Sequence, residues 1–391
     1  LSRSTVTHYP GFFMKPELFT RENIHTLTFP QTEDGDYARR YLLPLMMDGA
    51  QKYIRNVYNT QLMFAKVDDV IIPITVSDFH PDNTYTVSPY SHYVSYGGYE
   101  EVKHLNNPPV EVLIKLLLGP VAWYFRKADL DKVAYVNNYL LSTNLYPSVN
   151  SDQLSALCEA LPSWFPDRVI VFRSVDARKN PHLLDILKEK DYELALSRQV
   201  WYINTDEALR SRGYKEDARV LRNHKYEIVN GRDLSDEDLV RALDLYNMLY
   251  LEKYSYYNPQ FTLEFMKLAR DEEILHLLAL KRDRKINAVM GFFIRNGAMT
   301  PPLFGYDTSL PKEEGLYRLL TQVNIQEAVR RNLLVHMSSG VGKFKKARGG
   351  KSVIEYNAVY YRHLPAWRQR PWKLIQAISK VAIPYFQKMD F

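Results

Sequence analysis

Two parts of this sequence repeat one order of predicted elements, and that order restricts the fold more than any other feature. Each part begins with two strand-like runs around a charged pair, Asp68-Asp69 in the first and Asp283-Arg284 in the second, which is a hairpin signal. A third strand, a long helix and a further strand follow in each. Strands that alternate with long helices predict an α/β (or α+β) fold with a mixed central sheet flanked by helices. We therefore expect two similar halves.

The third predicted strand and the glycines near its end show how the two halves correspond. In the first half this strand is predicted at 84–90, and Gly97-Gly98 is predicted to form a turn after it. In the second half Gly305-Tyr306 stands at the matching place. No repeat of individual residues is visible, so the duplication depends on the order of elements alone.

The chain divides into five predicted regions. They are an N-terminal extension packed on the first domain (1–56), the first domain (57–205), a basic linker helix (206–232), a second and catalytic domain (233–364), and a basic amphipathic tail (365–391). The linker helix is either a solvated face or a phosphate-binding surface. The tail either packs its apolar face on the domain or makes a peripheral contact with an anionic membrane.

Positive charge is concentrated at one end of the chain. The net charge is +6, whereas the segment from Lys343 to Lys388 alone has 11 basic residues and one acidic residue, Glu355. This basic end predicts an anionic partner. The single cysteine, Cys158, excludes an intrachain disulfide and suits a reducing compartment, and no apolar run is long enough to cross a bilayer. We expect a cytoplasmic protein without a transmembrane segment.

A turn between a strand and a helix is the first candidate site, because backbone N–H groups at a helix N-terminus bind anions. Lys312-Glu313-Glu314-Gly315-Leu316-Tyr317 resembles the coenzyme A signature of the GNAT acyltransferases, which is Arg or Gln, two free positions, Gly, one free position, then Gly or Ala. Gly315 is kept, but Lys312 replaces Arg or Gln and Tyr317 replaces the small residue. Either the donor is held in another way, or this copy does not bind coenzyme A.

A wider stretch, Gly305 to Tyr361, resembles the C-terminal half of GNAT-type acetyltransferases related to the cellulose-biosynthesis CelD proteins, which are similar to the Fem-type aminoacyltransferases. The resemblance depends on a strand ending GYD, a helix beginning GLYRLL, a strand ending SSG, and the segments FKKARGG and EYNAVY. It implies two GNAT-like halves. It also implies acyl transfer from a thioester or an aminoacyl ester to an amine or hydroxyl.

Acyl transfer needs a base, donors for an oxyanion and an acid for the leaving group. The candidate catalytic residues in this stretch are Tyr306, Asp307, His336, Ser338 and Glu355. His336 and Ser338 lie on one side of a predicted strand, although a satisfied core histidine is the alternative for His336. Asp307 is either catalytic or a turn and capping residue. Glu355 either pairs with Lys345 or Arg348 or acts as the base.

The segment after Gly340 is predicted to be a mobile basic loop that binds phosphate. The candidate donor-binding residues are Lys312, Gly315, Ser339, Gly340, Lys343, Lys345, Lys346 and Arg348. The candidate substrate-binding residues are Tyr254, Asn258 and Tyr317. The sequence has no metal-binding motif, so no metal is expected.

These features together predict an N-acyltransferase that acts on an amine or hydroxyl of a small molecule. The expected donor is an acyl-CoA or acyl-carrier-protein thioester, which is a co-substrate and not a tightly bound cofactor. Aminoacyl-tRNA is the alternative donor, which the altered turn motif and the basic C-terminal segment favour. A catalytically silent GNAT-like module that docks on a membrane or nucleic acid is a third hypothesis.

Overall fold

The computed structural model describes residues 15–100 and 108–388. Twelve described strands form one sheet in the order β1-β2-β3-β4-β5-β12-β6-β11-β10-β9-β8-β7. Their bounds are Glu17–Phe19 (β1), Thr60–Val67 (β2), Val70–Ser77 (β3), Val133–Val136 (β4), Val169–Asp176 (β5), Glu193–Ile203 (β6), Glu227–Asn230 (β7), His276–Arg282 (β8), Lys285–Arg295 (β9), Ala298–Tyr306 (β10), Leu334–His336 (β11) and Gly350–Tyr360 (β12). The predicted α/β class is confirmed.

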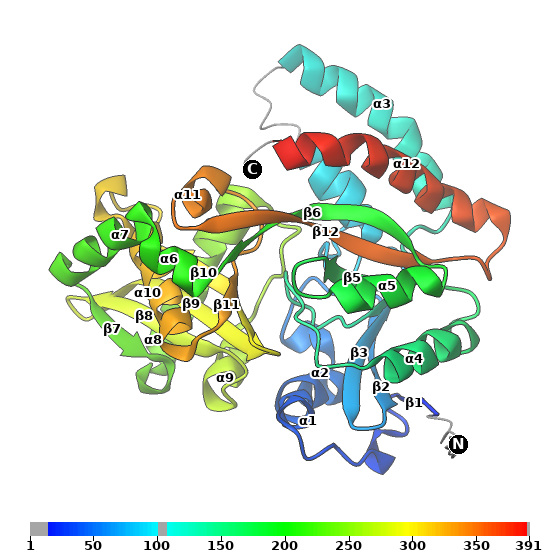
Figure 1. The fold of residues 1–391 in the computed structure, drawn as a ribbon, viewed down its shortest axis with the longest axis horizontal. Coiled ribbons are helices and arrows are strands. Elements are labelled where there is room, and N and C mark those ends of the chain that lie inside the picture. The colour runs from blue at the N-terminus through cyan, green and yellow to red at the C-terminus, as the bar shows by residue number, and fades with distance from the viewer. Residues whose placement is uncertain (1–14, 101–107, 389–391) are drawn as a thin grey trace, which may run out of the picture.

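Helices flank the sheet in both halves (Figure 1). The α-helices are Glu33–Tyr37 (α1), Leu43–Asp48 (α2), Pro108–Lys127 (α3), Ser151–Trp164 (α4), Pro181–Glu189 (α5), Thr205–Arg210 (α6), Arg212–Asn223 (α7), Asp236–Tyr246 (α8), Leu263–Asp271 (α9), Leu316–Arg331 (α10), Gly342–Lys346 (α11) and Ala366–Lys388 (α12). Short π-helical segments cover Ala38–Leu42 (η2), Ser91–Glu100 (η4) and Asn247–Tyr254 (η7). Side chains cap the main helices locally, as Asn150 and Gln153 do in the capping box of α4.

The duplication is visible in the topology. In the first half β3 pairs antiparallel with β4, and β4 pairs parallel with β5 after the crossover helix α4. In the second half β9 pairs antiparallel with β10, and β10 pairs parallel with β11 after α10. Each half therefore has an antiparallel pair followed by a parallel pair around a crossover helix.

The prediction of a third strand at 84–90 is wrong. Thr84 and Tyr85 donate their N–H groups to Asn56 and Tyr257, and the chain then enters η4, so no ladder forms. Gly97 lies inside η4, where an added Cβ would stand 2.8 Å from the carbonyl oxygen of His92, so the predicted turn at Gly97-Gly98 is also wrong. The third strand of the first half is β4, and η4 with α3 is an insertion before it.

The last strand of each half lies beside the other half. β6 follows β5 in the chain but pairs with β11, and β12 follows β11 but pairs with β5. At the centre of the sheet β6 and β12 run antiparallel along nearly their whole length, from Gly350 opposite Ile203 to Val359 opposite Glu193. Figure 1 shows the two long strands crossing between the halves. This exchange makes the two half-sheets one continuous sheet.

The C-terminal helix packs on this central pair. Trp372 of α12 is buried, its ring lies edge-on to Tyr93, and Ser379 Oγ accepts a hydrogen bond from the Leu196 N–H group of β6. The prediction that the tail packs an apolar face on the domain is confirmed. No helix of the described residues is long and apolar enough to cross a membrane.

Candidate functional site

β10 and β11 separate soon after they begin, and this separation defines the candidate site. The two parallel strands pair only at Ala298 with Leu334 and at Met299 with Val335. β10 then continues to Tyr306, whereas β11 turns toward β6, where Val335 and His336 are paired. The carboxyl ends of the two strands and the N-terminus of α10 therefore lie at the same end of the second half.

Aromatic side chains connect the end of β10 with α11. The ring of Tyr317, in the first turn of α10, contacts Phe304 and Tyr306 of β10 with centroid distances of 5.5 and 6.2 Å. It also contacts Phe344 of α11 at 5.0 Å. Tyr317 was predicted to bind substrate, and it replaces the small residue of the coenzyme A signature. The structure places its ring across the opening between β10 and α11.

Lys253 joins two predicted site residues at the edge of this aromatic group. Its Nζ lies 5.8 Å from the ring centroids of both Tyr254 and Tyr306. The ammonium also donates a hydrogen bond of 3.4 Å to the Tyr306 hydroxyl. Tyr254, Tyr306 and Tyr317 are thus brought together, with Lys253 added from η7.

The loop after β11 has an unusual backbone. Ser338, Gly340 and Val341 all have positive φ values of 55°, 79° and 47°. The ammonium of Lys345 explains this conformation, because it donates hydrogen bonds to the carbonyl oxygens of Met337, Ser338 and Ser339 at 2.6, 3.2 and 2.8 Å. Three carbonyl groups are therefore turned toward one buried cation.

The same arrangement directs backbone donors outward. In a trans peptide the C=O and N–H groups point in opposite directions. Because the carbonyls of Ser338 and Ser339 face Lys345, the N–H groups of Ser339 and Gly340 point away from it. Neither N–H group donates to an acceptor among the described residues, and Ser339 is exposed. Two adjacent free N–H groups of this kind can bind an anion or an oxyanion.

The prediction of a mobile basic loop after Gly340 is wrong, because the segment contains a helix. Two of the four cations predicted to bind phosphate are also buried. Residues 342–346 form α11, and Lys345 and Arg348 are buried. Burial holds the pKa of Lys345 well below its ordinary value, and the side-chain nitrogen of Lys345 donates its hydrogen bonds to backbone carbonyls. Arg348 Nε donates to Asp217 of α7 at 2.6 Å. Lys343 and Lys346 are exposed on α11.

A buried polar cluster lies beside this loop at the centre of the sheet. Arg198 of β6 stands opposite Glu355 of β12, and its Nε donates to Glu355 Oε1 at 2.9 Å. Its Nη1 donates to Ser338 Oγ at 3.1 Å, and its Nη2 donates to Ser142 O and Thr143 Oγ1 at 2.8 and 3.0 Å. One guanidinium thus contacts both halves of the protein.

The prediction that Glu355 pairs with Lys345 or Arg348 is wrong. The register of β6 and β12 places Arg198 beside it, while Lys345 and Arg348 point to other elements. Burial alone would raise the pKa of Glu355, but the charge of Arg198 and its hydrogen bond to the carboxylate outweigh burial and hold that pKa far below its ordinary value. Glu355 is ionised and fully engaged.

His336 is held from both ring nitrogens. Its Nδ1 accepts a hydrogen bond of 3.1 Å from the Ser338 N–H group, which places the ring hydrogen on Nε2 in the neutral form. Nε2 lies 3.8 Å from Glu355 Oε2. The ring is also buried and meets Tyr202 edge-on. This geometry fits the satisfied core histidine that was the alternative to a base.

Two of the three carboxylates in the turn from Asp307 to Gly315 are held by arginine side chains. Asp307 is buried, pairs with Arg241 at 2.5 Å and accepts the Ser309 N–H group, as a turn residue does. Glu314 is bound by Arg282 and Tyr226 at 2.9 and 3.0 Å. Lys312 is exposed, and Gly315 has a φ of 63°.

Asn258 is part of the contact between the halves. Its side-chain amide donates to Tyr250 O and Ser255 O at 3.0 Å, and its own carbonyl accepts from Asn56. The side chain is buried. The side chains of Asn258 and Asp307 are therefore both engaged in structural hydrogen bonds.

Two residues of the site were missed in the sequence. Arg198 is the only charged residue between Ala195 and Ile203, and a lone arginine within a buried strand is a signal of a paired charge. Lys253 ends a predicted amphipathic helix and carries no comparable signal.

One cavity lies at the other end of the strands. It has a volume of about 790 Å³, and charged side chains such as Arg295, Arg331 and Glu273 line it. Arg295 precedes β10 and Arg331 precedes β11, whereas Tyr306 ends β10 and Ser338 follows β11. None of the predicted site residues lines this cavity. No group of His, Cys, Asp and Glu that could hold a metal ion is found among the described residues.

Comparison with known proteins supports the fold. No protein-family model matches the sequence, and no curated protein matches it. Among solved structures, FemX aligns with a TM-score of 0.51 and 9% identity over 93% of this chain and 100% of that chain. A tandem GNAT protein from the clavulanic acid biosynthesis pathway gives a TM-score of 0.39 and 10% identity over 90% and 100% of the two chains. L-PGS from Bacillus licheniformis gives 0.43 and 14% over 57% and 77%.

The last two scores are too low to support an argument, whereas the FemX alignment covers nearly all of both chains. At 9% identity it shows a shared fold and nothing about chemistry. The expected Fem-type fold is thereby confirmed, and the strand pairing described above shows its two similar halves.

Proposed function

We propose that this protein is an acyltransferase that moves an acyl group from an activated donor to an amine or hydroxyl of a small molecule. One observation carries the proposal. Lys345 holds three carbonyls of the Ser338 to Gly340 loop, and the adjacent N–H groups of Ser339 and Gly340 have no acceptor. Such a pair of donors stabilises the oxyanion that forms when an amine or hydroxyl attacks an acyl carbonyl.

Tyr306 is the proposed acid for the leaving group. The Tyr306 hydroxyl, at the end of β10, accepts a hydrogen bond from Lys253 and can pass its own hydrogen to a departing thiolate or alkoxide. The phenolate that remains takes up the proton that the attacking amine or hydroxyl loses. His336 and Glu355 act as positioning residues in this scheme, because His336 Nδ1 accepts from Ser338 and both groups are buried. They hold the start of the loop that supplies the donors.

A thioester of coenzyme A or of an acyl carrier protein is one proposed donor. The separated ends of β10 and β11 would admit a narrow acyl chain, and the N-terminus of α10 would face its phosphates. Entry requires the Tyr317 ring to leave its contacts with Phe304 and Phe344. Lys312 is the exposed cation on this turn.

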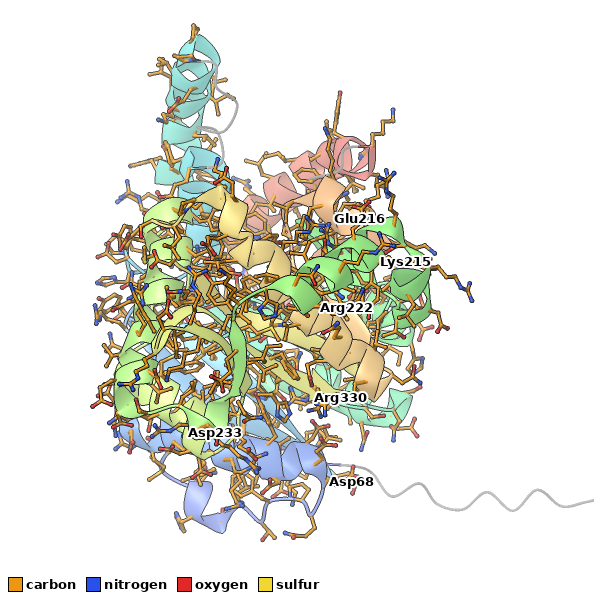
Figure 2. The ribbon with its side chains drawn as sticks, turned by 90° about the vertical axis from the view of Figure 1, so that its left-hand side faces the viewer. Asp68, Lys215, Glu216, Arg222, Asp233 and Arg330 are labelled. Atoms are coloured by element: carbon orange, nitrogen blue, oxygen red, sulfur yellow. The ribbon has the colours of Figure 1, made fainter. Side chains whose placement is uncertain are left out.

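Aminoacyl-tRNA is the second proposed donor, and the basic face of α7 favours it. Arg212, Lys215, Arg219 and Arg222 are exposed and recur three to four residues apart, so they form one stripe along the helix. Figure 2 shows Lys215 and Arg222 on this outer helix of the second half. A row of cations suits a nucleic acid backbone better than it suits one pyrophosphate.

The test is product analysis by mass spectrometry. The protein would be incubated with amine and hydroxyl acceptors together with acyl-CoAs, acyl carrier protein thioesters or charged tRNA. Transfer from a thioester, or from tRNA only, identifies the donor. No transfer with any donor would refute the enzymatic proposal and leave the silent binding module.

A further inference from the structure

The C-terminal helix has two apolar faces, and only one of them is covered. Its inner face packs on β6 and β12 through Trp372, Ile375 and Ser379, which are buried. A second set of apolar side chains points outward: Trp367, Leu374, Ile378, Val381 and Tyr385. The exposed fractions of Ile378, Val381 and Tyr385 are 56%, 68% and 67%. A helix that needed only to cover the sheet would have polar residues at these positions.

The outward set forms one continuous stripe. Its members follow one another at spacings of seven, four, three and four residues, which keeps them on the same side of an α-helix. The stripe therefore runs along most of α12, from Trp367 to Tyr385. Isolated exposed apolar residues need no explanation, but an aligned row does.

Cations flank the stripe, and no anion does. Arg370, Lys373, Lys380 and Lys388 are exposed on α12, and the helix contains no aspartate or glutamate. A partner that covered this helix would meet apolar side chains and positive charge together. A second copy of the chain would bring the same positive charge against it.

A neighbouring helix has the same kind of surface. Val112, Leu116 and Trp123 of α3 are more than half exposed, recur on one side of the helix, and are followed by Arg126 and Lys127. Ala122 and Phe125 of α3 share a buried cluster with Trp372 and Ile375 of α12, so one apolar cluster holds both helices to the protein. In both figures the helices project from the same end of the molecule.

We propose that the outer faces of α3 and α12 dock the protein on an anionic phospholipid bilayer. The apolar stripe would enter the boundary between headgroups and acyl chains, and the flanking cations would meet the phosphates. Tyr385 and the two tryptophans are amphipathic side chains that suit this depth. The docking is peripheral and does not depend on which reaction the protein catalyses.

Sedimentation with vesicles tests the proposal. We expect the full chain to sediment with vesicles of phosphatidylcholine and phosphatidylglycerol, and to remain in solution with phosphatidylcholine alone. The double variant Ile378→Ser with Val381→Ser should partition about tenfold less. Lys373→Glu with Lys380→Glu should reduce binding to the anionic vesicles by at least as much and should make it insensitive to added salt.

A matched control distinguishes the effect of the stripe on vesicle binding from the effect of exposed apolar residues elsewhere. Ile228 and Val240 are exposed aliphatic residues of the second half, so Ile228→Ser with Val240→Ser should leave vesicle binding unchanged. Circular dichroism of each variant would establish that it is folded. Absence of binding to anionic vesicles would overturn the proposal. So would light scattering that shows a wild-type dimer lost in the Ile378 and Val381 variant, because the stripe would then be covered by a second copy.

Discussion

Arg198 and Glu355 face each other at one register position of the two strands that cross between the halves, and their charged atoms lie 2.9 Å apart. The carboxylate is buried, and the guanidinium also holds Ser338 Oγ and the Ser142 carbonyl. One ion pair therefore joins both halves to the loop that supplies the proposed oxyanion donors. The folding of the sheet and the geometry of the candidate site depend on the same pair.

Removing one partner of this pair should destabilise the protein strongly. Glu355→Gln leaves Arg198 buried without a counter-charge, which costs about 3 kcal/mol of unfolding free energy. Urea denaturation measures this loss. The exposed pair of Lys52 and Asp48 is the control, because Lys52→Met should cost less than about 1 kcal/mol. Equal losses at the two pairs would contradict the central role of Arg198.

Asp131 should make stability fall as pH rises. Burial raises its pKa to about 7, against hydrogen bonds from Ser88 and Tyr90 that lower it. Between the ordinary carboxyl pKa of 3.8 and about 7, the folded state binds a proton that the unfolded state has lost. The contribution of protonated Asp131 to the free energy of unfolding is fully present below pH 3.8. It should decline across this range by up to about 4 kcal/mol.

The Asp131→Asn variant isolates this effect. Its unfolding free energy should decline less than that of the wild type between about pH 4 and pH 7, as measured by urea denaturation at each pH. Asp129→Asn, a change at an exposed neighbour, should reproduce the wild-type profile. Parallel profiles for Asp131→Asn and wild type would show that the carboxyl is ionised in the fold.

Lys345 should be a stability residue and not a donor-binding one. Lys345→Met leaves the carbonyl groups of Met337 and Ser339 without their donor, while Ser338 O keeps the Trp201 N–H group, and should cost about 3 kcal/mol of unfolding free energy. Lys343→Met, an exposed change two residues away, should stay within about 0.5 kcal/mol. A stable Lys345→Met variant would remove the explanation given for the loop backbone.

The sequence predicted the order of elements well, because hairpin signals and long amphipathic helices are local. The alternation that identifies β10, α10 and β11 does not depend on distant contacts. The prediction failed at 84–90, where the backbone carbonyls of Asn56 and Tyr257 accept the N–H groups of Thr84 and Tyr85, so that no strand ladder forms. Those partners are separated widely in the chain, so no local pattern records them.

The candidate site was predicted in part for the same reason. Ser338, Ser339 and Gly340 were identified from a strand that ends in small polar residues. The roles of the cations were wrong, because the sequence shows a run of lysines and arginines but not which of them is buried. Lys345 and Lys346 are adjacent, yet only the first reaches the carbonyls of Met337 to Ser339. Arg198, more than 150 residues from Glu355, needed the strand register to be recognised.

Tyr306→Phe should lower kcat and leave KM nearly unchanged if the phenol protonates the leaving group. The expected loss is about a hundredfold, typical of a general acid. Tyr254→Phe is the control, since its ring lies beside the same Lys253 without a hydrogen bond from it. Steady-state kinetics with the donor identified by mass spectrometry would measure both variants. A Tyr306→Phe enzyme with wild-type kcat would assign the proton to another group.

The N–H group of Gly340 can be removed without adding a side chain, by replacing the residue with its α-hydroxy acid so that the amide becomes an ester. Gly340 keeps its φ of 79°, which a proline or alanine would not tolerate, so the loop keeps its shape. The oxyanion loses one of two donors, and kcat should fall by about a hundredfold to a thousandfold. The same replacement at Gly297, a glycine with φ of 71° in the turn between β9 and β10, should leave kcat unchanged. Both variants exchange one amide for an ester. Equal kcat values for the Gly340 and Gly297 esters would therefore mean that the Gly340 N–H group does not donate a hydrogen bond to the oxyanion.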